Sequence, residues 1–130
     1  MKTTALLGIG LVGNTASIIF AFLAFLIKRS LLQMAEFSLM MGLTMFNYLG
    51  GTLLIFIALG VWKKGIMLGK VSIISGMENI LLGLLLVGIL LQDIVKAPLI
   101  ILPFFTGYGL IQQGKRAIAL EKMRGSFHFL

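Results

Sequence analysis

The chain has 130 residues, of which 59% are hydrophobic and 12% are charged, and its formal net charge is +7 at pH 7. In soluble domains about a quarter of the residues are charged, so this composition excludes an ordinary soluble protein and indicates an integral membrane protein. The chain contains no cysteine, which excludes disulfides and thiolate metal sites. Its basic residues lie between long apolar runs, so we attribute them to membrane topology and anionic lipid headgroups rather than to nucleic acid.

The first apolar run covers residues 5–27 and ends at Lys28. A secretory signal has an apolar region of about 7 to 15 residues, so this longer run is predicted to be the first transmembrane span. Small side chains recur within it at every fourth position, which favours close contact with a neighbouring membrane helix. These predicted packing residues are Gly13, Ser17 and Ala21.

The second apolar run covers residues 37–61 and stops at Trp62, which two lysines follow. An aromatic residue at headgroup depth beside basic residues is typical of a cytoplasmic membrane boundary. Two adjacent glycines, Gly50 and Gly51, lie near the middle of this run. Such a pair can kink a helix or allow another helix to approach closely, and we predict the close approach.

The third apolar run, residues 71–91, follows a short basic connection and carries Glu78 in its first half. A helix needs about 20 apolar residues to cross a hydrocarbon core of roughly 30 Å, so this run is predicted to be the third span. An ionisable side chain inside a span is costly and requires a structural or functional reason. Gly76 and Gly83 are predicted to pack against a neighbouring helix.

Pro98 opens the last apolar segment, where a proline suits the first turn because the N–H at that position has no helical partner. Pro103 lies inside the predicted helix and is expected to bend it. The uninterrupted apolar stretch, residues 98–111, would form a helix of about 21 Å, which is short for a full crossing. We therefore predict that the helix continues to about residue 119, and a re-entrant segment is the alternative.

The distribution of Lys and Arg predicts the orientation of the four spans. One predicted side of the membrane carries Lys2, Lys63, Lys64, Lys70, Lys115, Arg116, Lys122 and Arg124, and the other carries Lys28, Arg29 and Lys96. The positive-inside bias then places both termini in the cytoplasm. The basic tail, residues 115–130, would face anionic headgroups, and we expect a multi-pass protein of the cell membrane.

Strongly polar residues concentrate near the middle of the predicted spans. In hydrocarbon such groups must find partners inside the protein, because no water is available to them. We therefore predict that they face one another in a single buried layer. Its members would be Asn14, Asn47, Glu78, Asn79 and Tyr108.

The sequence offers little to catalysis or to a cofactor. A G-x-G-x-x-G spacing begins at Gly8, but the strand before it and the acidic residue after it that a dinucleotide site requires are both missing. Paired carboxylates, a catalytic triad and metal-ligand spacings do not occur. We therefore predict no enzyme activity, no cofactor and no metal site.

The chain is thus predicted to be all-α, with four antiparallel transmembrane helices joined by short connections. Glu78 has no Lys or Arg at its predicted depth, so it either fixes helix register through hydrogen bonds or binds a proton or cation. The leading hypothesis is a non-catalytic auxiliary or assembly subunit that packs with itself or with a larger membrane complex. The alternative is a minimal oligomeric transporter or channel that uses Glu78.

Overall fold

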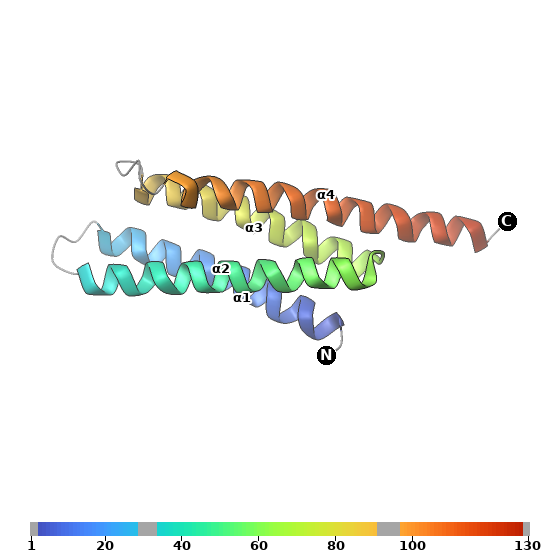
Figure 1. Ribbon diagram of the computed structural model, residues 1–130, viewed down its shortest axis with the longest axis horizontal. Helices are drawn as coiled ribbons and strands as arrows, with labels where there is room; N and C mark the ends of the chain where they lie inside the picture. Colours follow the sequence, from blue (N-terminus) through green and yellow to red (C-terminus); the bar gives the residue numbers. More distant parts are fainter. Residues whose placement is uncertain (1–2, 29–33, 91–96, 129–130) are drawn as a thin grey trace.

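The computed structural model describes residues 3–28, 34–90 and 97–128, and these residues form four helices. They are α1 (Thr3–Lys28), α2 (Met34–Trp62), α3 (Ile66–Leu90) and α4 (Ala97–His128). The helices lie side by side and alternate in direction, so the start of α1 and the end of α4 lie at the same end of the bundle (Figure 1). The prediction of an all-helical, four-helix protein is confirmed for the described residues.

Three of the described helices contain segments long and apolar enough to cross a membrane: Thr4–Ile27, Glu36–Trp62 and Ile66–Ile89. This supports a membrane protein with transmembrane helices. α4 is not among them, because its C-terminal half is rich in amide and charged residues from Gln112 onward. The predicted fourth span and the side on which the termini lie remain predictions at this point.

α3 begins at Ile66, five residues before the predicted start, and the basic connection shrinks to residues 63–65. Gly65 has a φ of 151°, a backbone conformation that glycine adopts far more easily than other residues. Its carbonyl accepts a hydrogen bond from the amide of Gly69 at 3.0 Å. Lys70 does not interrupt the helix, because its side chain is exposed. The predicted end of this span at residue 91 lies outside the described residues.

α4 is one continuous helix that passes Pro103 and extends beyond Gln112. The structure therefore has the predicted helical continuation, and α4 ends nine residues later than expected. Pro103 cannot donate to the carbonyl one turn before it. Around this position the hydroxyl of Thr106 donates within its own helix to the carbonyls of Leu102 and Pro103, at 3.1 and 3.2 Å.

The bundle consists of two tight hairpins, α1 with α2 and α3 with α4, which meet mainly through α1 and α3. In the second hairpin the backbones touch at glycines. A Cβ atom on Gly76 would lie 2.6 Å from the carbonyl oxygen of Gly107, and a Cβ on Gly107 would lie 2.6 Å from that of Gly76. Gly69 and Gly114 repeat this reciprocal contact one heptad away. A seven-residue repeat is typical of supercoiled helix pairs.

The first hairpin is built in the same way around Gly10 and Gly51. A Cβ on Gly51 would lie 2.6 Å from the carbonyl oxygen of Gly10. Of the residues predicted to pack, Ser17 and Ala21 are buried. The structure also places Gly13 against Gly51, and Gly76 and Gly83 against α4.

Gly50 is the exception among these predicted packing residues. It is exposed, and a Cβ built on it would meet nothing within 4 Å. The reason is the helical period: Gly51 already faces α1, so its neighbour Gly50 points about 100° away from that contact. The close approach therefore uses one glycine of the adjacent pair.

The glycine contacts predict a position-dependent response to added methyl groups. Gly76→Ala should destabilise the protein by roughly 1–3 kcal/mol, because the new Cβ would clash with backbone that cannot move alone. Gly42→Ala, where nothing lies within 4 Å, should be neutral or stabilising by up to about 1 kcal/mol. Thermal unfolding in detergent measures both variants. Equal effects of the two substitutions would contradict this packing.

Candidate functional site

Asn14 joins α1 to α2 in the interior of the bundle. Its side chain is fully buried, and its Nδ2 donates to the carbonyl of Gly10 at 3.1 Å. Its Oδ1 accepts a hydrogen bond from Thr52 Oγ1 of α2 at 3.2 Å. These side chains are short and reach each other because the contact between Gly10 and Gly51 brings the two backbones together.

Asn79 extends this connection to the other two helices. Its Nδ2 donates to Thr52 Oγ1 and to Thr106 Oγ1 of α4, each at 3.2 Å. Thr106 also shares a 2.7 Å hydrogen bond with the hydroxyl of Tyr48. Asn14, Thr52, Asn79, Thr106 and Tyr48 thus form one hydrogen-bonded series that includes side chains from all four helices. We call these five residues the polar chain.

The donors of the polar chain are nearly all used. The two hydrogens of the Asn79 amide go to the two threonines, and Thr52 donates onward to Asn14. The Oδ1 atom of Asn79, in contrast, is buried and has no hydrogen-bond partner among the described residues. Fully buried Leu82, Leu86 and Leu110 belong to the apolar core around this region.

Glu78 lies beside the polar chain and not in it. Consecutive residues on a helix point about 100° apart, so Asn79 faces the centre while Glu78 faces α1. The Glu78 Oε2 atom accepts a hydrogen bond from Thr15 Oγ1 at 2.7 Å, and Thr15 is exposed. The other oxygen, Oε1, is buried and has no partner among the described residues. Glu78 is the central residue of α3, and its depth in a membrane stays a prediction.

The predicted layer of five residues is therefore only partly assembled. The structure brings together Asn14 and Asn79. Asn47 instead donates to the carbonyl of Leu43 in its own helix, at 2.8 Å. Tyr108 is 65% exposed and points away from the bundle interior. Strong polarity at mid-span thus did not decide which side chains face inward.

Sequence reasoning did not include Thr106 of α4 in the predicted layer, although this residue belongs to the polar chain. It also missed Tyr48 and Thr52, which carry the α2 side of the polar chain. The two residues are four positions apart and therefore share one face of α2. Thr52 also follows Gly51 directly, at the contact between the helices. A polar residue next to a packing glycine was the available signal, because it lies where neighbouring backbones come closest.

The described residues contain no group of three or more His, Asp or Glu side chains that could hold a metal ion. Comparison with known proteins adds no assignment: no family model, curated protein or solved structure matches this chain. The site must therefore be interpreted from its own geometry.

The polar chain predicts a difference between two asparagines. Asn79→Ala should destabilise the protein by about 1–2 kcal/mol, because two interhelical hydrogen bonds are lost. Asn47→Ala removes only a contact within one helix and should cost less than about 0.5 kcal/mol. A double-mutant cycle with Thr52→Val should give a coupling of at least about 0.5 kcal/mol to Asn79→Ala. Strictly additive losses would show that the two side chains do not interact.

Proposed function

We propose that this protein is a non-catalytic integral membrane protein, an auxiliary or assembly subunit that packs with itself or with a larger membrane complex. The polar chain is the observation that carries the proposal. Apart from the Oδ1 atom of Asn79, its side-chain groups are engaged in hydrogen bonds at the centre of the bundle, where a solute site would need them free. Interhelical hydrogen bonds of this kind contribute about 0.6 to 2 kcal/mol each and define helix register.

In this proposal α4 crosses the membrane together with α3. The reciprocal contacts of Gly69 with Gly114 and of Gly76 with Gly107 hold the two helices at the same depth. The exposed Lys115 is close enough to the end of the bundle to reach headgroups with its charge while its carbons stay in hydrocarbon. Four crossings place both termini on one side, which the positive-inside bias assigns to the cytoplasmic side of the cell membrane.

A groove on the outer face of α1 and α2 supports the subunit role. It has a volume of about 310 Å³ and is lined by Ile9, Val12, Gly13, Phe46, Asn47, Gly50, Gly51 and Leu54. Phe46 is 75% exposed and Val12 is 68% exposed. A Cβ on Gly50 would meet nothing, so the floor of the groove is open to another helix. Small residues at membrane interfaces allow such close packing.

The absence of cysteine from the chain allows a direct test by single-cysteine cross-linking. We expect Val12→Cys, labelled in membranes with a benzophenone maleimide and irradiated so that the benzophenone inserts into a neighbouring C–H bond, to form a homodimer or an adduct with one larger membrane protein. Phe105→Cys is the matched control, because Phe105 is 71% exposed on α4, outside the groove. Only monomers with Val12→Cys, or identical patterns from both variants, would contradict a partner at this groove.

One observation favours a second candidate function, a minimal oligomeric transporter or channel. Glu78 is at mid-helix, its Oε1 is buried without a described partner, and its bonded neighbour Thr15 is exposed. An intramembrane acid that retains an unused oxygen can bind a proton or a cation. A second copy of the chain against α1 and α3 would enclose this carboxyl group.

Glu78→Gln separates the two functions. The glutamine carbonyl can still accept from Thr15, so the free energy of unfolding should change by less than about 0.5 kcal/mol. Under the subunit hypothesis, proteoliposomes that contain the wild-type protein show no more proton flux than empty liposomes. Proton flux that is present in the wild type and lost in Glu78→Gln would establish the transporter and overturn the leading proposal.

A further inference from the structure

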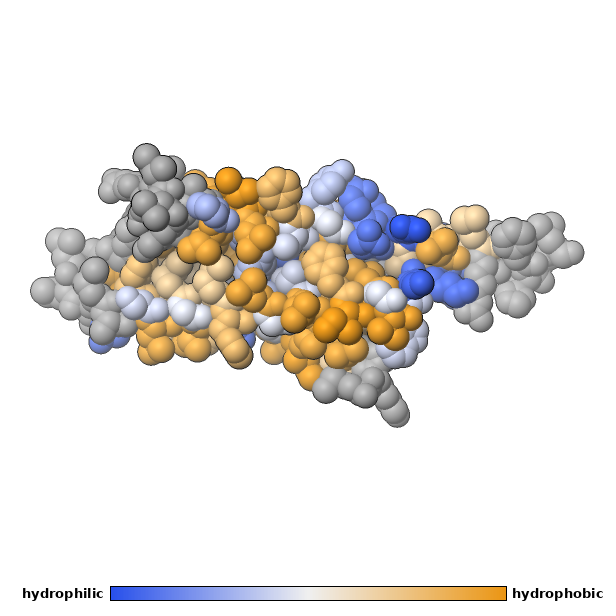
Figure 2. Space-filling view, in the orientation of Figure 1, coloured by the Kyte–Doolittle hydropathy of each residue, from blue (hydrophilic) through white to orange (hydrophobic). Residues whose placement is uncertain are grey.

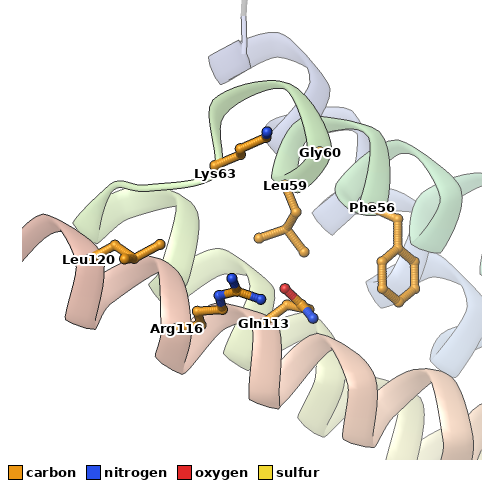
Figure 3. Close-up of a pocket in the computed structure, with 7 residues that line it drawn as sticks. All are labelled: Phe56, Leu59, Gly60, Lys63, Gln113, Arg116 and Leu120. Atoms are coloured by element: carbon orange, nitrogen blue, oxygen red, sulfur yellow. The ribbon is translucent and has the colours of Figure 1, made fainter.

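A second groove lies at the basic end of the bundle, between the end of α2 and the C-terminal half of α4. Its volume is about 410 Å³, and Phe56, Leu59, Gly60, Lys63, Gln113, Arg116 and Leu120 line it (Figure 3). Arg116 and Gln113 extend from α4 toward Leu59 of α2 (Figure 3). The groove combines two cations and an amide with apolar walls, and no carboxylate is among the residues that line it.

A backbone hydrogen bond joins the two segments that carry the cations of this groove, Lys63 and Arg116. The amide of Gly65, in the connection between α2 and α3, donates to the carbonyl of Ala117 in α4 at 3.2 Å. Gly65 lies two residues after Lys63, and Ala117 lies one residue after Arg116. This contact joins the backbone near Lys63 to the backbone near Arg116, although α2 and α4 contact each other little elsewhere. The amine of Lys63 itself points away from Arg116 (Figure 3), and its exposed side chain would have to turn toward the groove to act with Arg116.

Lys63 occupies a backbone position that glycine would fill more easily. It follows the last residue of α2, its φ is 59°, and its amide donates to the carbonyl of Leu59 at 2.9 Å. This is the left-handed cap that usually contains glycine, and a residue with a Cβ pays about 1–2 kcal/mol for it. Among the described residues, Lys63 is the non-glycine residue with a positive φ. Replacement of Lys63 by glycine would therefore remove a positive charge from the groove and relieve this backbone strain at the same time.

We propose that this groove binds the phosphate headgroup of an anionic phospholipid. The planar guanidinium of Arg116 can donate two parallel hydrogen bonds to phosphate, and Lys63 can supply a second positive charge. Phe56, Leu59 and Leu120 would contact the glycerol and the upper part of an acyl chain. The site rests on the membrane placement in the proposed function, which puts this end of the bundle at headgroup depth.

The residues around the groove are typical of a surface at the depth of the lipid headgroups. Trp62, next to the groove, is 45% exposed, and tryptophan is enriched where headgroups meet hydrocarbon. Figure 2 shows hydrophilic residues gathered over the C-terminal half of α4, whereas hydrophobic residues predominate over the rest of this face. A phosphate at the groove would thus lie at the boundary between the two surfaces, with its acyl chains on the hydrophobic side.

The test compares each lining cation with its neighbour in the sequence. Native mass spectrometry of the full chain in detergent would measure binding of dioleoylphosphatidylglycerol and, as the zwitterionic control, dioleoylphosphatidylcholine. The lining variants are Lys63→Gly, which also removes the left-handed strain, and Arg116→Gln. The matched controls are Lys64→Gln and Lys115→Gln, which remove equal charge from exposed positions outside the groove.

We expect each lining variant to lose about tenfold in affinity for phosphatidylglycerol, as the loss of a charge-assisted hydrogen bond predicts. The controls should lose less than about threefold, and Lys63→Gly should unfold at the same or a higher temperature than the wild type. Equal losses in lining and control variants would overturn the site in favour of diffuse electrostatic attraction. Displacement of the lipid by millimolar inorganic phosphate would overturn it in favour of a soluble phosphate ligand.

The failure of this inference can be distinguished from a failure of the proposed function. If the expressed protein does not partition into the membrane fraction, the membrane placement itself is wrong. If it partitions there but binds phosphatidylglycerol and phosphatidylcholine equally, the lipid site is wrong and the proposed function stands.

Discussion

The close contact of backbones at glycine pairs is the constraint on which the rest of this bundle depends. Gly10 with Gly51 in the first hairpin, and Gly76 with Gly107 in the second, leave no room for a Cβ atom. Lipid tails are as apolar as leucine side chains, so membrane helices gain little from hydrophobic contact alone and rely on such packing. Once the helices are this close, short polar side chains beside the glycines can hydrogen-bond across the gap.

The polar chain is assembled from equivalent parts of the two hairpins. Each hairpin provides one asparagine, Asn14 or Asn79, within one turn of its packing glycine. Each also provides one threonine, Thr52 or Thr106, directly beside a packing glycine on the partner helix. The hydrogen bonds of Asn79 to Thr52 and of Tyr48 to Thr106 then join α2 to the second hairpin, where the helices contact each other little. The hydrogen bond of Asn79 to Thr106 links the two helices of the second hairpin. Polar groups are costly in hydrocarbon when unpaired, so their mutual pairing strongly favours one arrangement of the two hairpins.

The sequence predicted the number, type and approximate bounds of the helices, because long apolar runs and their basic boundaries report directly on membrane spans. It predicted the inner face less well. Asn47 and Tyr108 lie near the middle of their helices, as expected, but their side chains do not join the polar chain. The position of a residue along a span predicts how deep it lies, but it does not predict which side of the helix its side chain occupies. The three apolar spans are hydrophobic on every side, so no polar face marks the core as it would in a soluble bundle. The small residues determine which side of each helix faces its neighbour, so Gly51 predicts the inward position of Thr52 better than polarity does.

The same packing explains why the basic end of the bundle has a groove. The glycine pairs draw α1 to α2 and α3 to α4, and the hairpins meet mainly through α1 and α3, which leaves α2 and α4 apart. At the centre of the bundle the polar chain bridges this separation through Tyr48 and Thr106. Just after the end of α2, a backbone hydrogen bond from Gly65 to Ala117 connects the chain to α4. The groove between α2 and α4 at this end has apolar walls and two cations. Under the proposed membrane placement, neighbouring lipids would fill this space. The cations that line it would then favour lipids that carry a negative charge over those that do not.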